Sequence, residues 1–196
     1  MTRSGSALPL PGGDPGCGTI SVKGEKHTRW VVVLGDTLPC LAALRSDPAV
    51  LLTDGAAGQY AEAAVIGVNA SAATTRRAFK NTLQRQAQAC VTACKQWTSL
   101  RHIMVIVDAA GSLADKEVIH QCDIAADTTH RMIEQICGIY VIVTFIVVTG
   151  CDDPRLLAHR VLCRAEQIPA TDAYSAVHWR EIVQSSIQHI NVDRYL

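Results

Sequence analysis

The chain has 196 residues, of which 48% are hydrophobic and only 18% are charged, a composition that excludes a disordered polypeptide and fits one globular domain. Its 18 basic residues balance its 18 acidic residues. The chain therefore has no net field that would hold nucleic acid or an anionic membrane surface.

The first residues differ in composition from the rest of the chain. The run Pro11–Gly16 contains three glycines and two prolines, so we expect residues 1–26 to form a flexible tail and residues 27–196 to form a single domain. Residues 1–18 lack the apolar segment of a signal peptide. The longest apolar run, Ile139–Val148, is about half as long as a membrane span. These features predict a soluble intracellular protein that does not enter a membrane.

Apolar runs and helix-periodic segments alternate along the remaining chain. The runs predict strands at residues 30–34, 49–53, 63–69, 102–107 and 140–148. The intervening segments predict helices near residues 38–46, 72–96 and 115–137, followed by helices from about residue 154 that break near Ile168-Pro169. This alternation predicts an α/β fold with a mostly parallel sheet flanked by helices, of the Rossmann-like or small-GTPase-like type.

The turn after the first strand lacks a phosphate-binding loop. Nucleotide-binding domains place G-x-x-x-x-G-K-[S/T] there, so that backbone N–H groups and a lysine hold phosphates. This chain instead has Gly35-Asp36-Thr37-Leu38-Pro39-Cys40, with one glycine, no lysine and an acid. The sequence therefore predicts no nucleotide, no cofactor and no enzymatic activity.

Acidic residues at the ends of the strands support an alternative interpretation. Asp36, Asp108 and Asp152 follow different strands, and ligands of doubly wound folds bind at that edge of the sheet. A small cytosolic α/β enzyme or nucleotide binder could use them. The run Asp54–Gln59 resembles the γ-phosphate-sensing element of small GTPases, but a polar turn is the simpler interpretation. Asp152 and Asp153 could bind Mg²⁺ with Asp36 or Asp108, but nothing nearby would hold the substrate phosphate such sites use, so we predict no metal site.

Eight cysteines are spread irregularly along the chain and include no C-x-x-C pair. Cys90 and Cys94 stand four residues apart in an expected helix. Zinc sites usually combine short cysteine spacings with histidines, so this pattern favours free thiols buried in a reducing compartment.

Four segments, in order and spacing, carry a resemblance to a known family. They are Val32-Val33-Leu34-Gly35, Ala64–Asn69, Val105–Gly111 and Arg160–Pro169. In these segments the chain resembles the centromere protein M family, whose members are kinetochore subunits with a small-GTPase-like fold and no nucleotide site. The resemblance covers residues 28–187; the tail before it and the residues after Ser186 differ.

The resemblance implies a non-catalytic scaffold of the inner kinetochore, in the nucleus, that stabilises a helical-repeat partner, centromere protein I, together with proteins H and K. Leu100 and Tyr174 stand where the family contacts that partner. Val177 and Trp179 join them as contact candidates because they cluster with Tyr174 near an expected helix start, and aromatic residues are enriched in interfaces. The alternative for all four residues is ordinary core packing.

Overall fold

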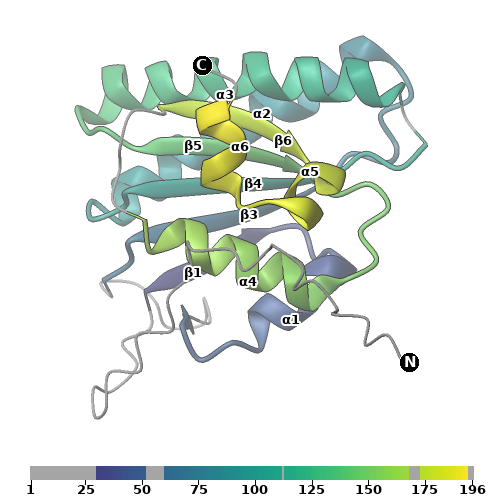
Figure 1. Ribbon diagram of the computed structural model, residues 1–196. Coiled ribbons are helices and arrows are strands. Elements are labelled where there is room, and N and C mark those ends of the chain that lie inside the picture. Colours follow the sequence, from purple (N-terminus) through teal and green to yellow (C-terminus); the bar gives the residue numbers. More distant parts are fainter. Residues whose placement is uncertain (1–29, 52–59, 112, 168–172, 194–196) are drawn as a thin grey trace, which may run out of the picture.

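The computed structural model describes residues 30–51, 60–111, 113–167 and 173–193 (Figure 1). The expected tail over residues 1–26 and the run Asp54–Gln59 lie outside the described residues.

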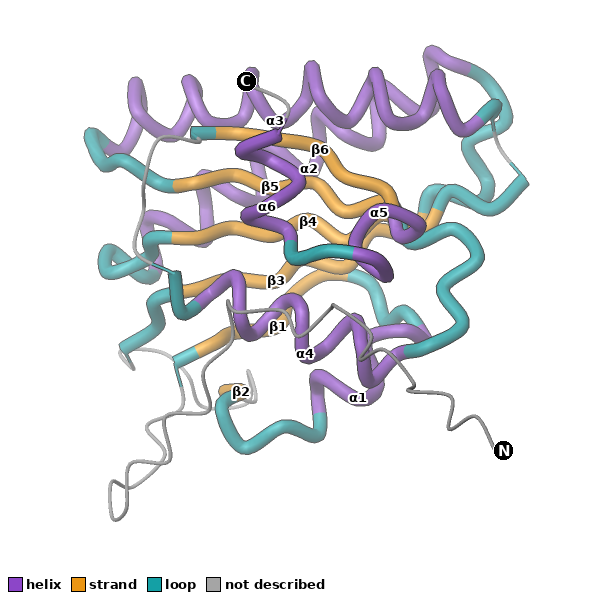
Figure 2. The backbone as a smooth tube through the Cα atoms, in the orientation of Figure 1, coloured by secondary structure: helices purple, strands orange, loops and turns teal. Residues whose placement is uncertain are grey.

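A parallel sheet of six strands forms the centre of the described structure (Figure 2). The strand order is β2-β1-β3-β4-β5-β6, and each neighbouring pair is parallel. The fold class predicted from the sequence is confirmed, with a sheet that is parallel throughout. The order reverses between β1 and β3, which makes this the topological switch point of a doubly wound sheet. The strands are β1 (Val31–Gly35), β2 (Val50–Leu51), β3 (Ala63–Asn69), β4 (His102–Asp108), β5 (Ile142–Val147) and β6 (Tyr174–His178).

Helices cover both faces of the sheet and give a three-layer architecture (Figures 1 and 2). Helices α2 (Arg76–Gln96) and α3 (Asp115–Cys137) pack on one face around Phe79, Phe145 and Ile133. The other face is covered by shorter elements around Leu41, Met104 and Trp179. These are the 3-10 helix η1 (Pro39–Leu41), α1 (Ala42–Arg45), α4 (Pro154–Ala165), α5 (Trp179–Gln184) and α6 (Ile187–Asp193).

Local signals in the sequence set the ends of the long helices. Helix α2 begins at residue 76, later than the expected residue 72, because the Thr75 side chain caps it by accepting a hydrogen bond from the Ala78 N–H at 3.2 Å. Helix α3 has the predicted bounds and ends at Gly138, whose φ of 67° is the left-handed conformation that closes many helices. The strand predicted at residues 63–69 also has the predicted bounds.

The C-terminal region contains a strand where the sequence predicts helix. Residues 174–178 form β6, which pairs in parallel with β5 so that Val143 lies opposite Tyr174. Tyr174 and Val177 are therefore strand residues, and only Trp179 stands at a helix start. The prediction of helix for residues 174–178 is wrong because tertiary contacts decide the structure here: the short segment pairs with β5 and packs against α3.

Candidate functional site

The switch point between β1 and β3 is the place where a fold of this type binds ligands, and here two backbone segments meet across it. The Asp36 N–H donates to the Gly67 carbonyl oxygen at 2.9 Å. A Cβ atom added to Gly67 would lie 2.3 Å from the Asp36 carbonyl oxygen. A Cβ atom added to Gly35, whose φ is +76°, would lie 2.4 Å from the Gly67 carbonyl oxygen. Only glycine fits at both positions, so the turn lies directly against β3.

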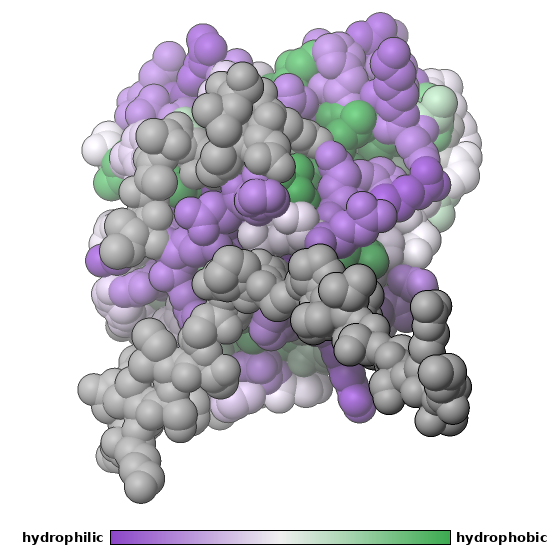
Figure 3. Space-filling model, in the orientation of Figure 1, coloured by the Kyte–Doolittle hydropathy of each residue, from purple (hydrophilic) through white to green (hydrophobic). Residues whose placement is uncertain are grey.

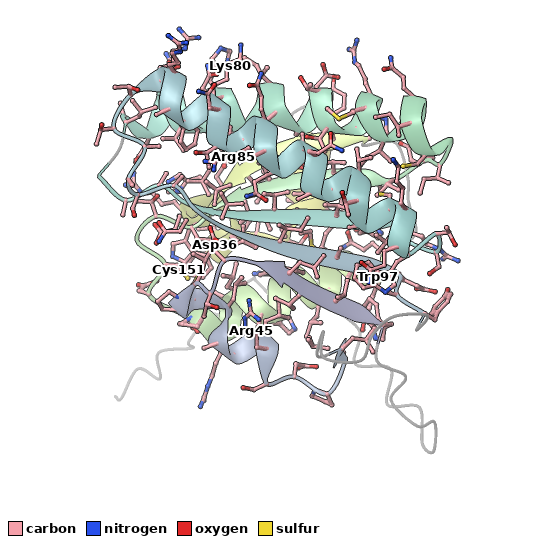
Figure 4. All side chains as sticks on the ribbon, turned by 180° about the vertical axis from the view of Figure 1, so that it is seen from behind. Asp36, Arg45, Lys80, Arg85, Trp97 and Cys151 are labelled. Carbon is pink, nitrogen blue, oxygen red and sulfur yellow. The ribbon has the colours of Figure 1, made fainter. Side chains whose placement is uncertain are left out.

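The side chain of Asp36 extends this contact. Its Oδ2 accepts a hydrogen bond from the Asn69 N–H at 2.8 Å, at the end of β3. The Asn69 Oδ1 in turn accepts from the N–H and the hydroxyl of Ser71, at 3.1 Å and 2.7 Å. A carboxylate thus takes a backbone N–H that could otherwise face an anionic ligand. Its negative charge also opposes the binding of phosphate at this edge. Figure 4 shows Asp36 at this edge of the sheet.

The helix that follows the first strand is also unsuited to anion binding. The first strand is followed by the 3-10 helix η1, which has Pro39 in its first turn. Its N-cap residue, Leu38, provides no side-chain hydrogen bond. Proline has no N–H to donate. Helix α1 then continues for only four residues, Ala42–Arg45. The segment after β1 therefore contains no long helix of the kind whose dipole and free N–H groups hold phosphates in nucleotide-binding domains.

The other acids at the strand ends are occupied by the chain's own donors. Asp108 Oδ1 accepts from the Ala110 N–H at 3.2 Å, and Asp152 Oδ1 accepts from the Trp179 indole N–H at 3.1 Å. Asp153 caps α4 by accepting from two backbone N–H groups, at 3.0 Å and 2.9 Å. Within the described residues, no group of three His, Cys, Asp or Glu side chains could hold a metal ion. These bonds give each acid a structural role.

Two half-buried thiols, Cys40 and Cys151, lie at the same edge. Burial, followed by the proximity of Cys151 and Asp108, raises the pKa of Cys40 to about 11. Burial also raises the pKa of Cys151, and the neighbouring acids add to that shift. Both thiols are therefore protonated at neutral pH, which makes them poor nucleophiles.

Three further cysteines are buried between the sheet and its helices. Cys90, Cys94 and Cys122 are free thiols, as the sequence predicts, and burial raises the pKa of each, that of Cys94 to about 12. Cys17 lies outside the described residues.

The four predicted partner contacts do not form one exposed surface. Leu100, Val177 and Trp179 are buried, with at most 3% of their surface exposed. Their burial favours the alternative interpretation, in which they pack the core. Tyr174 is only half-buried. The contact prediction itself stays a prediction, and Tyr174 is the residue of the four that a partner could reach without unfolding the domain.

Tyr174 belongs to an aromatic cluster that sequence reasoning missed. The His130 ring lies 6.1 Å from the Tyr174 ring and 5.3 Å from the Tyr140 ring, centre to centre. Tyr140 is 47% exposed, and Ile136 nearby in the sequence is 50% exposed. Helix α3, the loop before β5 and strand β6 contribute to this cluster, so no local sequence pattern could have identified it.

No protein-family model, curated protein or solved structure matches the chain. Among the described residues, no helix is long and apolar enough to span a membrane. The fold and the site together define a doubly wound α/β domain whose switch point is closed by its own backbone.

Proposed function

We propose that the chain is a non-catalytic scaffold subunit of the inner kinetochore that acts in the nucleus, at the centromere. Its partner in this proposal is centromere protein I, a helical-repeat protein that it binds and stabilises together with proteins H and K. The partner and the location come from the resemblance of four sequence segments to the centromere protein M family.

The closed switch point is the observation that carries the non-catalytic part of the proposal. Gly35 and Gly67 bring the turn against β3, and Asp36 then accepts the Asn69 N–H. This arrangement supports a domain that keeps the frame of a nucleotide-binding protein without its ligand site. The alternative of an enzyme that uses Asp36, Asp108 and Asp152 has less support, because all three acids accept hydrogen bonds from the chain itself.

The proposal is tested by coexpression of the chain with centromere proteins H, I and K, followed by size-exclusion chromatography. We expect one complex that contains all four proteins, and we expect protein I to be less soluble when the chain is left out. Coelution of H, I and K without the chain, under conditions in which each protein is folded, would contradict the proposal.

A second experiment tests the chemistry of the closed site. The purified chain is titrated with GTP, GDP and ATP in the presence of Mg²⁺, with calorimetry and thermal melting as measurements. We expect no heat of binding and no shift in melting temperature at millimolar nucleotide. A Mg²⁺-dependent shift with micromolar affinity would favour the nucleotide-binding alternative. In that case Asp36→Ala would identify whether the switch point holds the ligand.

A further inference from the structure

A shallow apolar groove runs between α2 and α3 on the outer surface of the domain. The two helices lie side by side and run in the same direction (Figures 1 and 2), because each follows a parallel strand. The groove has a volume of about 280 Å³. Its apolar lining consists of Leu83 and Ala87 from α2, and of Ile124, Ala125 and Met132 from α3. This volume falls below the range of about 300–1,000 Å³ for small-molecule sites, so the groove suits the side chains of another protein.

One wall of the groove exposes a large apolar residue. Ile124 is 44% exposed, whereas Leu83 on the opposite side is buried. A single exposed isoleucine is ordinary on a protein surface. Here it continues directly into the apolar lining, so the exposed and buried apolar atoms form one strip along the groove.

The α2 side of the groove is strongly basic. Helix α2 has five basic residues and no acid in its 21 residues. Lys80 stands at the rim of the groove, and Arg77 lies one turn before it on the same side of the helix. Figure 4 shows Lys80 and Arg85 on α2, but Arg85 lines a separate pocket with Asn69 and Gln88 and does not line this groove. Within the described part of the chain, Arg77 and Lys80 form no ion pair.

The α3 side does not cancel this charge. Arg76 pairs with Glu117 of α3 at 2.9 Å, and Gln121 donates to the same carboxylate at 3.1 Å. Asp127 pairs with Arg131 at 2.8 Å and does not line the groove. The two ion pairs compensate Arg76 and Asp127. The described residues that line the groove include one cation, Lys80, and no acid, so the potential along the rim is positive.

We infer that this groove binds an amphipathic helix of a partner protein, whose apolar face enters the groove and whose acidic residues face Lys80 and Arg77. A helix places apolar side chains at intervals of three and four residues, which matches a groove formed by the ridges of two helices. The acidic character follows from charge complementarity with α2. The inference rests on the proposed function, because it assumes that the chain is a protein-binding subunit.

The test uses two stapled helical peptides of equal length with leucines at the same positions. One peptide has glutamate at the positions beside the leucines, and the other has lysine there. Binding to the full chain is measured by fluorescence anisotropy at physiological salt. We expect the glutamate peptide to bind, and we expect the affinity of the lysine peptide to be lower by a factor of roughly ten or more.

Variants of the chain locate the binding surface. Lys80→Glu and Ile124→Ser change exposed groove residues and are each expected to weaken the glutamate peptide roughly tenfold. Lys95→Glu makes the same charge change on the same helix outside the groove lining and is the matched control, expected to bind like the wild type. Hydrogen exchange of the wild-type chain gives a measurement that needs no variant, with protection expected in α2 and α3 when the peptide binds.

The inference is overturned if neither peptide binds, if both bind equally, or if Lys95→Glu weakens binding as much as Lys80→Glu. The same variants tested with the coexpressed H, I and K complex separate this inference from the proposed function. If that complex binds Lys80→Glu and Ile124→Ser like the wild type, the groove inference is wrong and the kinetochore role stands. If the peptides behave as expected but the complex does not bind the wild-type chain, the kinetochore role fails and the groove inference stands.

Discussion

Replacing Gly67 by alanine tests whether the β1 turn lies directly against β3. The added Cβ atom would lie 2.3 Å from the Asp36 carbonyl oxygen, whereas ordinary contacts of this kind are 3.4–4 Å long. The same Cβ atom would also lie 3.3 Å from the Leu41 side chain, which leaves little room for it to move away from Asp36. Since the nearest atom belongs to the backbone, the whole turn has to move by about 1 Å.

The expected loss of stability has two parts. Forcing an extra methyl group into a packed site costs about 1–3 kcal/mol. Movement of the turn also breaks or stretches the bond from the Asp36 N–H to Gly67 and the bond from the Asn69 N–H to Asp36, which are worth about 1 kcal/mol each where partly exposed. We therefore expect Gly67→Ala to lower the free energy of unfolding by about 3–5 kcal/mol. For a domain of this size the melting temperature would fall by roughly 2–4 °C for each kcal/mol.

Urea unfolding followed by circular dichroism measures this loss, and Gly138→Ala is the control. Gly138 has a positive φ of 67° but no atom within 4 Å of an added Cβ, so that variant carries backbone strain without a clash. We expect it to lose about 1–2 kcal/mol, the cost of the left-handed conformation for a residue that has a side chain. A Gly67→Ala variant that is as stable as the wild type, or no less stable than Gly138→Ala, would refute the contact between the turn and β3.

Three further predictions concern the core, a helix cap and the thiols. Val177→Ala, at a fully buried position of β6, should lower the free energy of unfolding by about 2–3 kcal/mol in urea titration, and a loss below about 0.5 kcal/mol would place this side chain at the surface. The pKa of His178 lies below its usual 6.5, chiefly through burial, and its Nδ1 accepts the Arg180 N–H only when neutral. The unfolded chain therefore binds this proton at higher pH than the folded chain, so stability should be lost as pH falls below about 6.5. His178→Asn, which keeps a capping acceptor, should show a smaller drop between pH 7 and pH 5 in thermal melts, and an equal drop would assign the dependence to other groups. Iodoacetamide at pH 8, followed by mass spectrometry of the peptides, should label Cys163 in the folded chain and Cys122 only after unfolding. Burial raises the pKa of Cys122 and hides its sulfur, whereas Cys163 is only half-buried. Labelling of both cysteines at equal rates would contradict the packing of α3.

The sequence predicts elements well where local signals and packing agree. Helix α3 has a continuous apolar stripe and a terminal glycine, and its predicted bounds match the structure. Strand β6 has neither advantage. It is only five residues long, and Trp179 starts the next helix directly after His178. A sequence window long enough to detect periodicity covers both β6 and the helix that follows it. It therefore mixes the two-residue repeat of a strand with the 3.6-residue repeat of a helix, and the sequence alone cannot separate them.

The candidate site could be predicted in part. The run Gly35-Asp36 indicates that the phosphate loop is missing, and the structure places Asp36 at the switch point. The sequence analysis does not identify Gly67 as the residue that Asp36 contacts, although the sequence contains a signal for it. Gly67 interrupts an otherwise apolar strand, and an isolated glycine in a strand often marks close approach of another backbone segment. The identity of that segment depends on the pairing of β1 with β3, which no local pattern contains.

A closed switch point changes how stability responds to binding. In a ligand-dependent domain of this architecture, the ligand fills the crevice and stabilises the fold by mass action. Here Asp36 and the Gly35–Gly67 contact fill that position from within the chain. A protein partner can stabilise the domain through the face formed by α2 and α3, which offers the apolar groove and the cations Arg77 and Lys80. Thermal melting should therefore rise with a protein partner and stay unchanged with nucleotide, which joins the site and the groove in one measurement.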